Sequence, residues 1–518
     1  MRAWAAWAAF LLVAAPVATG QEPAASSEEG SDQPQRPPPV LRLSLRDAVD
    51  LGLARNLGLR SARLGALMAR IDVAIEEAAW DPTFTGVVTG GETQIPSRST
   101  LAGADVVDTD HFNFALGLQK PTRLGPVLGI DWRSDRVFTN STFSSINPAY
   151  EGFLELSITV PLLRGSGRAV NAAALRSARL VAEQSRLDFQ AVAAQVMEAV
   201  GIAYWDVVYR RGRVDVLRKS WGVALDVEEA ERKKLRSGDG TRVDVMQARA
   251  QAKRREADWI GGKREAGDAA DRLRSLILPF LGTAGDEVVL EPSDAPAGVQ
   301  NPPTLDKAVQ TALARRPELR HADLEVARLN EEITLAEDAA KPQLDLRGAV
   351  AGRGVTSDFG SSVRNTLDGS AFSANASLTM SQILGRRAAK SALTRSFLDR
   401  ERAVVARLDT MNTIVVEVRA AHRALTANAQ ENAAALEEVA AAEESLRGER
   451  LRLQRGDSTV LLVNQTEENM TSARLRELQT RVALEGARVA LGRVTGVLLQ
   501  EFGVGFDDDL HAVPASHD

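Results

Sequence analysis

Few residues in this 518-residue sequence are spaced so that they could do catalytic chemistry. Histidine is the common general base and metal ligand near neutral pH, but the chain has only 5 histidines and no cysteine. The histidines are scattered and share no metal-ligand spacing: His111, His321, His422, His511 and His517. The motifs G-x-S-x-G and H-E-x-x-H and the Walker loop are absent. The sequence therefore predicts no catalytic site, no metal site, no cofactor and no enzyme activity.

The most distinctive polar residues lie in two short glycine–aspartate segments. SGDGTRVDVMQ begins at Ser237 and RGDSTVLLVNQ begins at Arg455, 218 positions later. Glycine permits the positive φ at which a helix ends, and Thr241 or Thr459 can cap the helix that follows. Each segment is predicted to be a tight turn between two helices. By residue type alone, both also fit ordinary helix–turn–helix connections.

Other segments that flank these turns also occur twice. LRDAVDLGLARNLGLR starts at Leu45 and LDKAVQTALARRPELR at Leu305, an offset of 260. The later segments LSITVPLL and ASLTMSQIL are related at a shorter offset. We therefore predict an internal two-fold repeat, with copies at 43–285 and 304–500 joined by a linker at 286–303. The shorter offset leaves the first copy with roughly 40 extra residues between Pro82 and Leu154.

Each copy is predicted to contain one very long helix, over 168–236 and 388–455. In the second, apolar residues follow a seven-residue lattice typical of a coiled-coil seam: Phe397, Val404, Met411, Val418, Leu425, Val439, Leu446 and Leu453. A helix of 68 residues is about 100 Å long. The returning helices, 242–281 and 459–498, are shorter. We expect 305–340 to extend the first of them and 45–80 to extend the second, each as a single helix of about 36 residues.

Strands are predicted between the helices. Residues 154–160 alternate between apolar and polar side chains, as do residues 372–380. One apolar and one polar face suit a wall between lipid and water, although a half-buried soluble sheet alternates in the same way. The extra residues 91–150 contain a further alternating hairpin. It could lengthen this wall or form an extracellular cap, and we favour an extension outside the lipid zone.

The two ends of the chain carry targeting and tail signals. Residues 1–20 read as a secretory signal peptide, followed by a disordered Pro/Glu/Ser-rich linker over 21–42. No later run of 18 apolar residues indicates a membrane-spanning helix, but a β-barrel needs no such run. A formal charge of −6 offers no basic patch for nucleic acid. The aspartates of FDDDL could suggest calcium, but we expect 501–518 to be a flexible acidic tail.

The sequence resembles the TolC-like outer membrane efflux proteins. The resemblance rests on LSLRDAVDLGLARNLGLRSARL, TLDKAVQTALARRPELRHADLEVA, VPLLRGSGR and the two glycine–aspartate turns, and it covers roughly residues 43–500. It implies an α+β membrane protein in which a long α-helical coiled-coil barrel, the periplasmic tunnel, is continuous with a transmembrane β-barrel. It also implies a homotrimer in which each chain gives four strands to the shared barrel.

The same resemblance implies the function and the partners. The chain would be the outer membrane channel of a tripartite efflux or type I secretion system. It would passively conduct substrates from an inner membrane transporter and a periplasmic adaptor to the exterior of a Gram-negative-type envelope. Its β-barrel would contact outer membrane lipid. The cargo and the cognate pump do not follow from the sequence.

In this family the turns at the periplasmic tip meet the adaptor and control opening. The matching positions here are Ser237, Gly238, Asp239, Thr241, Arg455, Gly456, Asp457 and Thr459. Arg242, Asp244, Gln247 and Gln465 are candidate polar residues of the tunnel entrance, or else part of a solvated helix face. Some relatives carry acidic residues in the second copy, where this chain has Leu462 and Gln465.

The alternative is a soluble periplasmic coiled-coil adaptor or scaffold. It accounts for the heptads and the signal peptide. It does not account for duplicated helices with strands between them, and we find no lipoyl-like module in the sequence.

Overall fold

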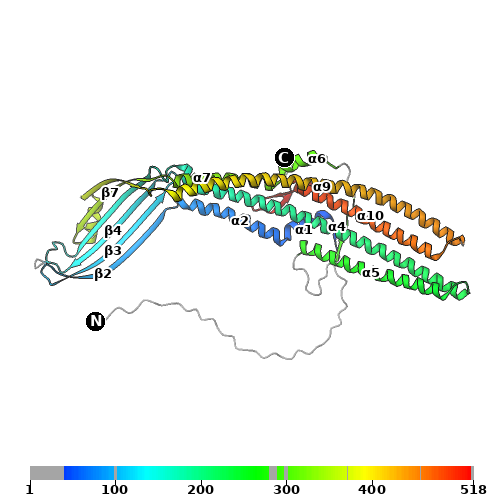
Figure 1. The fold of residues 1–518 in the computed structure, drawn as a ribbon. Helices are drawn as coiled ribbons and strands as arrows, with labels where there is room; N and C mark the ends of the chain where they lie inside the picture. The colour runs from blue at the N-terminus through cyan, green and yellow to red at the C-terminus, as the bar shows by residue number, and fades with distance from the viewer. Residues whose placement is uncertain are drawn as a thin grey trace, which may run out of the picture.

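The computed structural model describes residues 40–98, 102–278, 289–296, 302–369, 371–455 and 457–514. The predicted signal peptide lies outside these residues, as does nearly all of the linker predicted at 21–42. The molecule is elongated: one β-sheet stands at one end, and long helices run from it to a tip at the other (Figure 1).

The segments predicted as single helices of about 36 residues are each divided in two. The first comprises α1 and α2, ending in a 3-10 turn η1, and the second comprises α6 and α7: Leu45–Arg55, Leu57–Glu77, Ala78–Trp80, Leu305–Arg315 and Pro317–Ala339. The break residues Asn56 and Arg316 are extended, with ψ of 127° and 125°. Asn56 caps α2 by accepting from the N–H of Leu59. Arg316 is extended because Pro317 follows it, and proline disfavours helical geometry in the residue before it.

The long helices are present close to their predicted bounds. The first is α4, preceded by the short α3, and it is followed by α5: Ala173–Ser237, Arg168–Asn171 and Arg242–Ile277. The second is α9, followed by α10 and the short α11: Arg387–Arg455, Val460–Val494 and Leu498–Glu501. The 69 residues of α9 correspond to a rod of about 100 Å.

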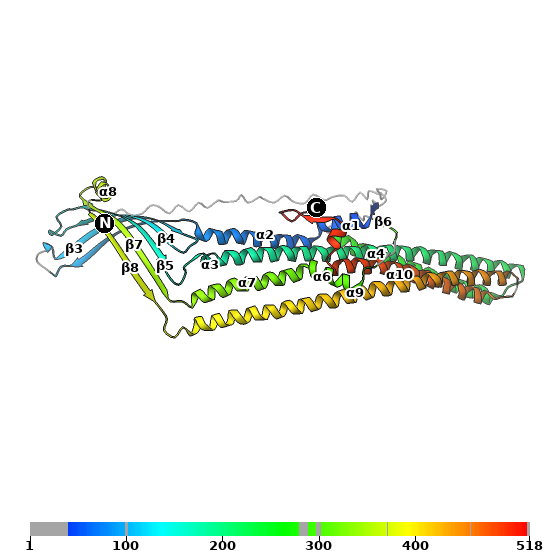
Figure 2. The ribbon, with the colours of Figure 1, turned by 90° about the horizontal axis from the view of Figure 1, so that it is seen from above.

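The stacking of the shorter helices differs from the prediction. The end of α5 meets α1, where the Asn56 side chain donates to the carbonyl of Leu276 at 3.4 Å. The end of α10 meets α6. Gly496, just after α10, is so close to Arg315 that a Cβ added to it would lie 3.2 Å from that residue. Thus α5 extends α1–α2 (Figure 1), and α10 extends α6–α7 (Figure 2). Helix length alone could not decide between the two pairings, because both returning helices are equally short.

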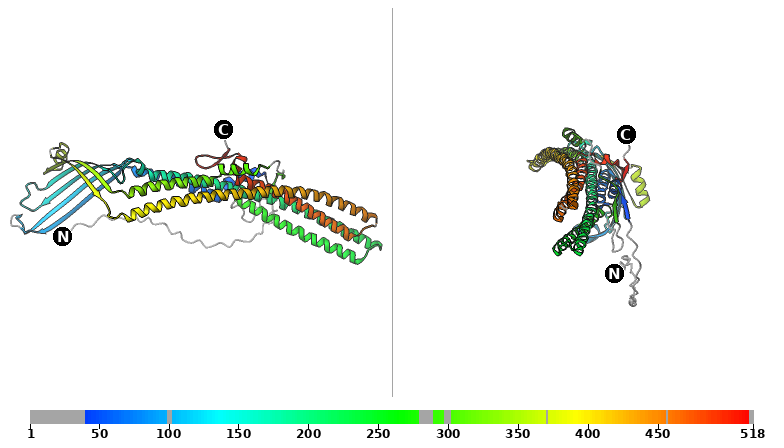
Figure 3. Two further views of the ribbon diagram at one scale, coloured as in Figure 1. Left: turned by 45° about the horizontal axis from the view of Figure 1, so that its top comes forward. Right: turned by 90° about the vertical axis from the view of Figure 1, so that its right-hand side faces the viewer.

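The helices form one curved layer, visible when the molecule is seen from the tip (Figure 3, right). Next to the sheet the contacts run α2–α4–α7–α9, and towards the tip they run α5–α4–α10–α9. Four helices therefore lie side by side at each level. The helix α9 is at one edge of the layer throughout, and α2 and α5 share the other edge.

The central helix of the layer, α4, is apolar because it packs against other helices of the chain. Among the described helices, Arg168–Ser237 contains an 18-residue window with a mean hydropathy of 1.3, apolar enough to cross a bilayer by composition. Yet α4 contacts α2, α5, α7 and α10, and its residues Met197, Val200 and Tyr204 are buried among them. Packing within the layer accounts for this apolarity.

A six-stranded antiparallel sheet covers the other end, in the order β2-β3-β4-β5-β7-β8. Its strands are Thr83–Pro96, Val106–Pro121, Val127–Thr139, Ala149–Pro161, Gln343–Thr356 and Ala371–Ser381. A short helix α8, Phe359–Leu367, connects β7 to β8. The extra hairpin of the first half is β3–β4. It lies inside the sheet, between β2 and β5, so the expectation that it stands outside the wall was wrong.

A pair of short strands lies beside the helices at the middle of the rod. The pair β1–β6, Val40–Leu43 with Val289–Pro292, is parallel and includes residues predicted as linker. The buried Tyr204 hydroxyl donates to the Leu43 carbonyl and accepts from the backbone N–H of Asp294, both at 3.1 Å.

The predicted flexible acidic tail is also folded up to residue 514. Its strands β9 and β10, Val504–Phe506 and Ala512–Pro514, form a hairpin. Phe506 packs edge-on against Phe189 of α4 with ring centroids 4.9 Å apart, and Leu510 is buried. The side chains of Arg63 and Arg70 donate to backbone carbonyls of the aspartate run. The two arginines thus attach the aspartate run to α2.

Candidate functional site: sheet faces and helical tip

Paired residues form rows that cross the sheet, and neighbouring rows project from opposite faces. Two neighbouring rows at the centre of the sheet differ sharply in polarity. One row runs across all six strands with apolar side chains only: Phe84, Leu118, Ile130, Leu156, Val350 and Ala374. The next row, on the opposite face, is polar or small: Thr85, Gly117, Asp131, Glu155, Ala351 and Ser373. The apolar row is exposed, with Phe84 at 67% and Leu156 at 47%. An apolar surface of this extent is typical of contact with lipid or protein.

The polar face carries paired charges. Arg347 donates to Glu155 across β7 and β5 at 2.6 Å. The guanidinium groups of Arg133 and Arg353 lie on either side of Phe153, at 5.7 and 5.6 Å from its ring centroid. Charged side chains on one face and exposed aliphatic ones on the other are the arrangement of a wall between water and lipid.

The first tip turn has the predicted helix-end geometry. Gly238 ends α4 with φ of 88°. Thr241 caps α5: its Oγ1 accepts from the Asp244 N–H at 3.2 Å, while the threonine N–H and hydroxyl donate to the Asp244 carboxylate. The hydrogen bond from the Thr241 hydroxyl, and to a smaller extent the one from its backbone N–H, hold the pKa of the Asp244 carboxyl below its ordinary value. Ser237 donates to carbonyls of the preceding turn.

The second tip turn is less tightly capped. Thr459 accepts from the Leu462 N–H at 3.4 Å, and the N–H of Asp457 donates to the carbonyl of Arg452. Arg455 is the last residue of α9. Gly456, predicted to act at this turn, lies outside the described residues.

A polar hollow at the tip collects residues from both hairpins. Of the predicted residues, Asp239, Asp244, Gln247, Thr459 and Gln465 line it, whereas Ser237, Gly238, Thr241, Arg242, Arg455 and Asp457 do not. The hollow also contains residues that the sequence analysis did not identify: Glu231, Lys234, Arg254, Asn464 and Glu468. Asn464 belongs to the second glycine–aspartate segment. Glu231, Arg254 and Glu468 lie outside both segments, and the side-by-side packing of the hairpins brings them to the hollow.

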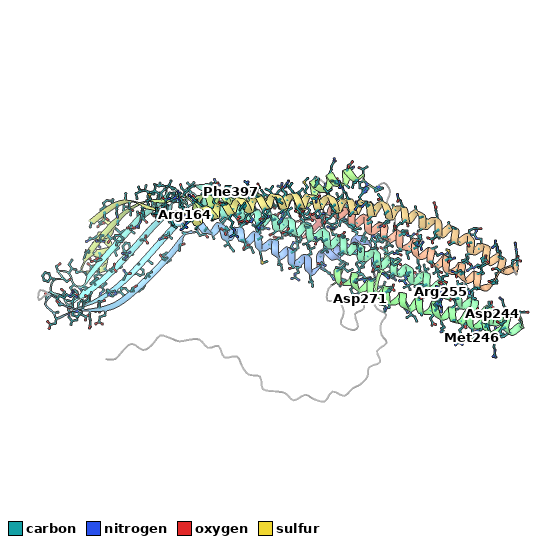
Figure 4. All side chains as sticks on the ribbon, in the orientation of Figure 1. Arg164, Asp244, Met246, Arg255, Asp271 and Phe397 are labelled. Carbon is teal, nitrogen blue, oxygen red and sulfur yellow. The ribbon has the colours of Figure 1, made fainter. Side chains whose placement is uncertain are left out.

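One ion pair links the hairpins next to this hollow. Arg255 of α5 lies 3.5 Å from Glu468 of α10, and its side chain is only 12% exposed. Figure 4 places Arg255 inward of Asp244 and Met246, which stand at the tip. Charge pairing between α5 and α10 is therefore available where the two hairpins approach the tip.

Within the described ranges, no group of three or more histidine and acidic side chains is close enough together to hold a metal ion. Of the histidines considered above, His422 contacts the carbonyl of Pro303 and His511 contacts Asp507. These contacts join segments of the fold to one another.

Comparisons with known proteins agree with this architecture. Residues 308–497 match the model of the family described as outer membrane efflux protein. A search of curated proteins found no match. Among solved structures, CusC is similar with a TM-score of 0.66 and 16% identity, over 88% of this chain and 92% of that one.

Two further solved structures have the same fold. The CmeC outer membrane channel of Campylobacter jejuni gives a TM-score of 0.63 at 16% identity, covering 88% of this chain and 86% of that chain. The open-state MtrE outer membrane channel of Neisseria gonorrhoeae gives 0.60 at 20% identity, covering 88% and 89%. At these identities the likeness shows the fold.

The resemblance drawn from the sequence is therefore confirmed, and a soluble adaptor is not favoured. The matched family is described as outer membrane efflux protein, and the CmeC and MtrE structures are those of outer membrane channels. Residues 308–497 thus match the outer membrane efflux protein family, and the chain has the fold of the outer membrane channels CusC, CmeC and MtrE.

Proposed function

We propose that three copies of this chain assemble into one continuous conduit. The sheets would close a barrel in the outer membrane and the helical layers a tunnel in the periplasm. The conduit would passively pass substrates from an inner membrane transporter and its periplasmic adaptor to the exterior. The observation that carries this proposal is that a row of apolar side chains crosses all six strands while the next row, on the opposite face, is polar or small.

Assembly is supported by apolar stripes on the two edges of the helical layer. The edge helix α2 exposes one stripe: Leu64, Met68, Ile71 and Ile75, at 54–62%. The opposite edge helix α9 exposes another: Leu398, Val405 and Leu408, at 56–65%. Both helices adjoin the sheet in the chain, α2 before β2 and α9 after β8, and Figure 4 shows Phe397 at the sheet end of α9. Two different edges that complement each other generate a ring when the rotation closes.

The number of strands fits a ring of three. Six strands from each of three chains make eighteen. Spaced about 4.8 Å apart and tilted by about 40°, eighteen strands have a perimeter of about 113 Å. A ring of twelve helices, four from each chain, has a perimeter of about 96–120 Å at an interaxial distance of about 8–10 Å. Twelve strands would give only about 75 Å on the same geometry.

We further propose that the chain arose by internal duplication, with units at 43–285 and 304–500. The paired sequence segments support it, as does the matching order of short helices, strands, long helix and returning helix in each half. Each unit would then supply one long helix and one two-part returning leg to the tunnel wall.

We also propose that the tip residues meet the adaptor and line the tunnel entrance. The supporting observation is the polar hollow where Asp239, Asp244, Gln247, Thr459 and Gln465 converge. We assign Ser237, Gly238, Thr241, Arg242, Arg455, Gly456 and Asp457 to the same tip region on the basis of the family resemblance. The tip is the end of the rod opposite the sheet, where a periplasmic partner can reach it (Figure 1).

The decisive experiment is purification from membranes followed by reconstitution. We expect the protein to need detergent, to run as a trimer by native mass spectrometry, and to conduct ions in a planar bilayer. Electron cryomicroscopy of the trimer should resolve eighteen strands. A water-soluble monomer without conductance would contradict the proposed function, and a twelve-stranded barrel would contradict only the proposed strand number.

The tip assignment has its own test. Gly238→Val forces a β-branched residue into a positive φ. We expect dye export by cells that depend on this channel to fall while the amount of trimer is unchanged. Gly222→Ala is the matched control, because Gly222 lies within α4 with open space around it. Normal export by the Gly238 variant would contradict the assignment.

A further inference from the structure

The short helix α8 lies flat against the sheet instead of projecting from it as a loop. It contacts β7 and β5, and Figure 2 shows it over one side of the sheet at the end remote from the long helices. Its side chains Ser362 and Thr366 are buried, at 0% and 3% exposure. Small polar residues thus face the sheet, which is the reverse of an ordinary surface helix.

Three glycines form the surface on which α8 rests. A Cβ at Gly354 would lie 2.6 Å from the carbonyl of Ser362, and Cβ atoms at Gly152 and Gly352 would overlap Thr366. The Ser362 hydroxyl donates to the Gly354 carbonyl at 3.3 Å. The backbone of α8 therefore approaches the strands as closely as it does only because these positions have no side chain.

The face covered by α8 is the apolar one. Gly152 of β5 pairs with Ser134 of β4 and with Gly354 of β7 in a single row. Side chains two residues apart on a strand share a face, so this row shares the face of Leu154 and Leu156. The polar face, which carries Glu155 and Arg347, is on the other side.

The position of α8 along the strands corresponds to a gap in the apolar band. On β5 the apolar run extends from Val160 to Leu154, about 20 Å along the strand, or about 15 Å of height at a tilt of about 40°. A transmembrane barrel needs an apolar band of about 25 Å. Beyond Leu154 the row members on β4, β5 and β7 are Ser134, Gly152 and Gly354.

The contrast with β3 supports this interpretation. The same row meets Phe114 on β3, and the next row meets Phe112, so that strand continues the band with its own side chains. The main contacts of α8 are with β5 and β7. The helix thus covers strands whose own apolar side chains end early, and it exposes Phe359 at 53% and Leu367 at 62%.

We infer that α8 is a membrane-contacting helix whose Phe359 and Leu367 lie against lipid acyl chains of the outer leaflet, completing the apolar band that glycine positions leave open. The occupant is lipid because the exposed side chains of α8 continue a face already suited to lipid. The inference rests on the proposed function, which places the sheet in the outer membrane.

The chain has no cysteine, so a single engineered cysteine can carry an environment-sensitive NBD fluorophore. We compare Phe359→Cys with two reference sites on β7: Leu346→Cys on the apolar face and Val355→Cys on the polar face, whose native residues are 40% and 42% exposed. Each labelled protein is placed in nanodiscs containing brominated phosphatidylcholine. We expect the label at 359 to lose fluorescence to the same extent as the label at 346.

The outcomes separate the inference from the proposed function. If the label at 346 is not quenched by brominated lipid, the sheet is not in the membrane and the proposed function fails. If 346 is quenched but 359 responds like 355, only the inference about α8 is overturned. A label at 359 that is shielded from both brominated lipid and aqueous iodide would show that a second copy covers the helix, which also overturns it.

A second variant tests the glycine seat. Gly354→Ala in the Phe359→Cys protein should displace α8 and reduce quenching at 359. The matched control is Gly348→Ala, because Gly348 lies on the same face of β7 and a Cβ there meets only Ile158 at 3.6 Å. Quenching at 346 reports whether either variant is still inserted. Equal quenching at 359 in both inserted variants would contradict the role of the seat.

Discussion

The two halves of the chain agree in their helices and differ in what lies between and beside them. The first short helices, α1 and α6, have 11 residues each. The returning helices α5 and α10 have 36 and 35 residues, and the long segments Arg168–Ser237 and α9 have 70 and 69. By contrast, the β3–β4 hairpin belongs only to the first half, and α8 belongs only to the second.

This difference shows where the architecture constrains the sequence. Helices that pack side by side must keep a common axial register, so a change of one residue would shift every apolar contact after it. Strand connections at the far end of a sheet have no such requirement and can gain a hairpin or a helix. The equal lengths therefore belong to the helical layer, and the differences belong to the end that carries the sheet.

The same helix break is also stabilised by different chemistry in each half. At the first break, the Asn56 side chain accepts from the Leu59 N–H and donates to the Leu276 carbonyl. At the second, the buried Arg316 guanidinium bonds to Glu318 and Glu417. An amide cap and a buried ion network thus maintain an equivalent bend.

The largest effect should come from placing a charge in the seam of either half. Val200 and Val418 are 218 positions apart, and both are 0% exposed. Val200→Asp or Val418→Asp buries an unpaired carboxylate among apolar side chains, at a cost on the order of 4 kcal/mol or more. We expect neither variant to accumulate as a trimer in outer membrane fractions.

The control for these variants is Val416→Asp, two residues away on α9 and 55% exposed. It should assemble normally, because a carboxylate at this exposed position stays hydrated. If the Val418 variant assembled while the Val200 variant did not, the two halves would not be equivalent in the tunnel wall, and the comparison between them would fail.

The second-largest effect should be a loss of stability when the residue at either helix break, Arg316 or Asn56, is replaced. Arg316 is 6% exposed at its side chain, while Glu318 and Glu417 are 34% and 37% exposed. Arg316→Ala should destabilise the protein by about 2–3 kcal/mol, less than the full cost of breaking a buried pair because both glutamates can be hydrated. Asn56→Ala should cost about 1 kcal/mol, as for other helix caps.

Thermal unfolding of the detergent-solubilised protein, followed by circular dichroism, measures both variants at the breaks. Arg320→Ala, an exposed arginine on α7, should change stability by less than about 0.5 kcal/mol. An Asn56 variant less stable than the Arg316 variant would show that the amide cap, not the ion network, is the stronger of the two devices.

Much of the helical layer could be predicted from the sequence, because the periodicity of apolar residues reflects the packing of helices. The heptad lattice identified Val418 and Leu425, which are 0% and 1% exposed. It could not show that Phe397, on the same lattice, is 40% exposed. A pattern records that a face is apolar, but it does not record whether the same chain or another covers it.

The membrane end and the tip were harder to predict. Alternation in β3 and β4 was clear, but alternation does not specify which strands a hairpin joins, so its place inside the sheet was missed. At the tip, Asp244 and Gln465 were found from the turns. Glu231 and Glu468 were not, because they reach the hollow only through the packing of two helices distant in sequence. The break before Pro317 carried a signal, since the residue before proline disfavours helix.

A smaller effect should come from one position where the halves differ by a methyl group. Gly52 of α1 corresponds to Ala312 of α6, and a Cβ at Gly52 would lie 2.9 Å from Val200 Cγ2. Crowding a stiff valine costs about 1–3 kcal/mol, while alanine gains about 1 kcal/mol in helix propensity. We expect Gly52→Ala to be destabilising by about 1 kcal/mol. Gly65→Ala, in open space on α2, should be stabilising by a similar amount.

The smallest effect is the pH dependence that Glu325 of the second half contributes to stability. Hydrogen bonds from Arg328 lower the pKa of Glu325 from 4.5 to about 2, with a further contribution from Gln184. The corresponding residue of the first half is Gly65. Because the folded-state pKa is depressed, the carboxylate adds stability that is fully present above pH 4.5 and is lost as the pH falls towards 2. Since Glu325 is about one-third exposed, solvent screening limits this contribution to less than about 1 kcal/mol.

The measurement is the difference in unfolding temperature between the wild-type protein and Glu325→Gln at several pH values. Wild type should be the more stable at pH 7, and the difference should narrow below pH 4.5 and vanish near pH 2. Gly65→Ala, which introduces no titrating group, should keep a constant difference from wild type over the same range. A Glu325→Gln difference independent of pH would mean that Arg328 is satisfied by Glu332, its other partner, and that this asymmetry between the halves has no effect on stability.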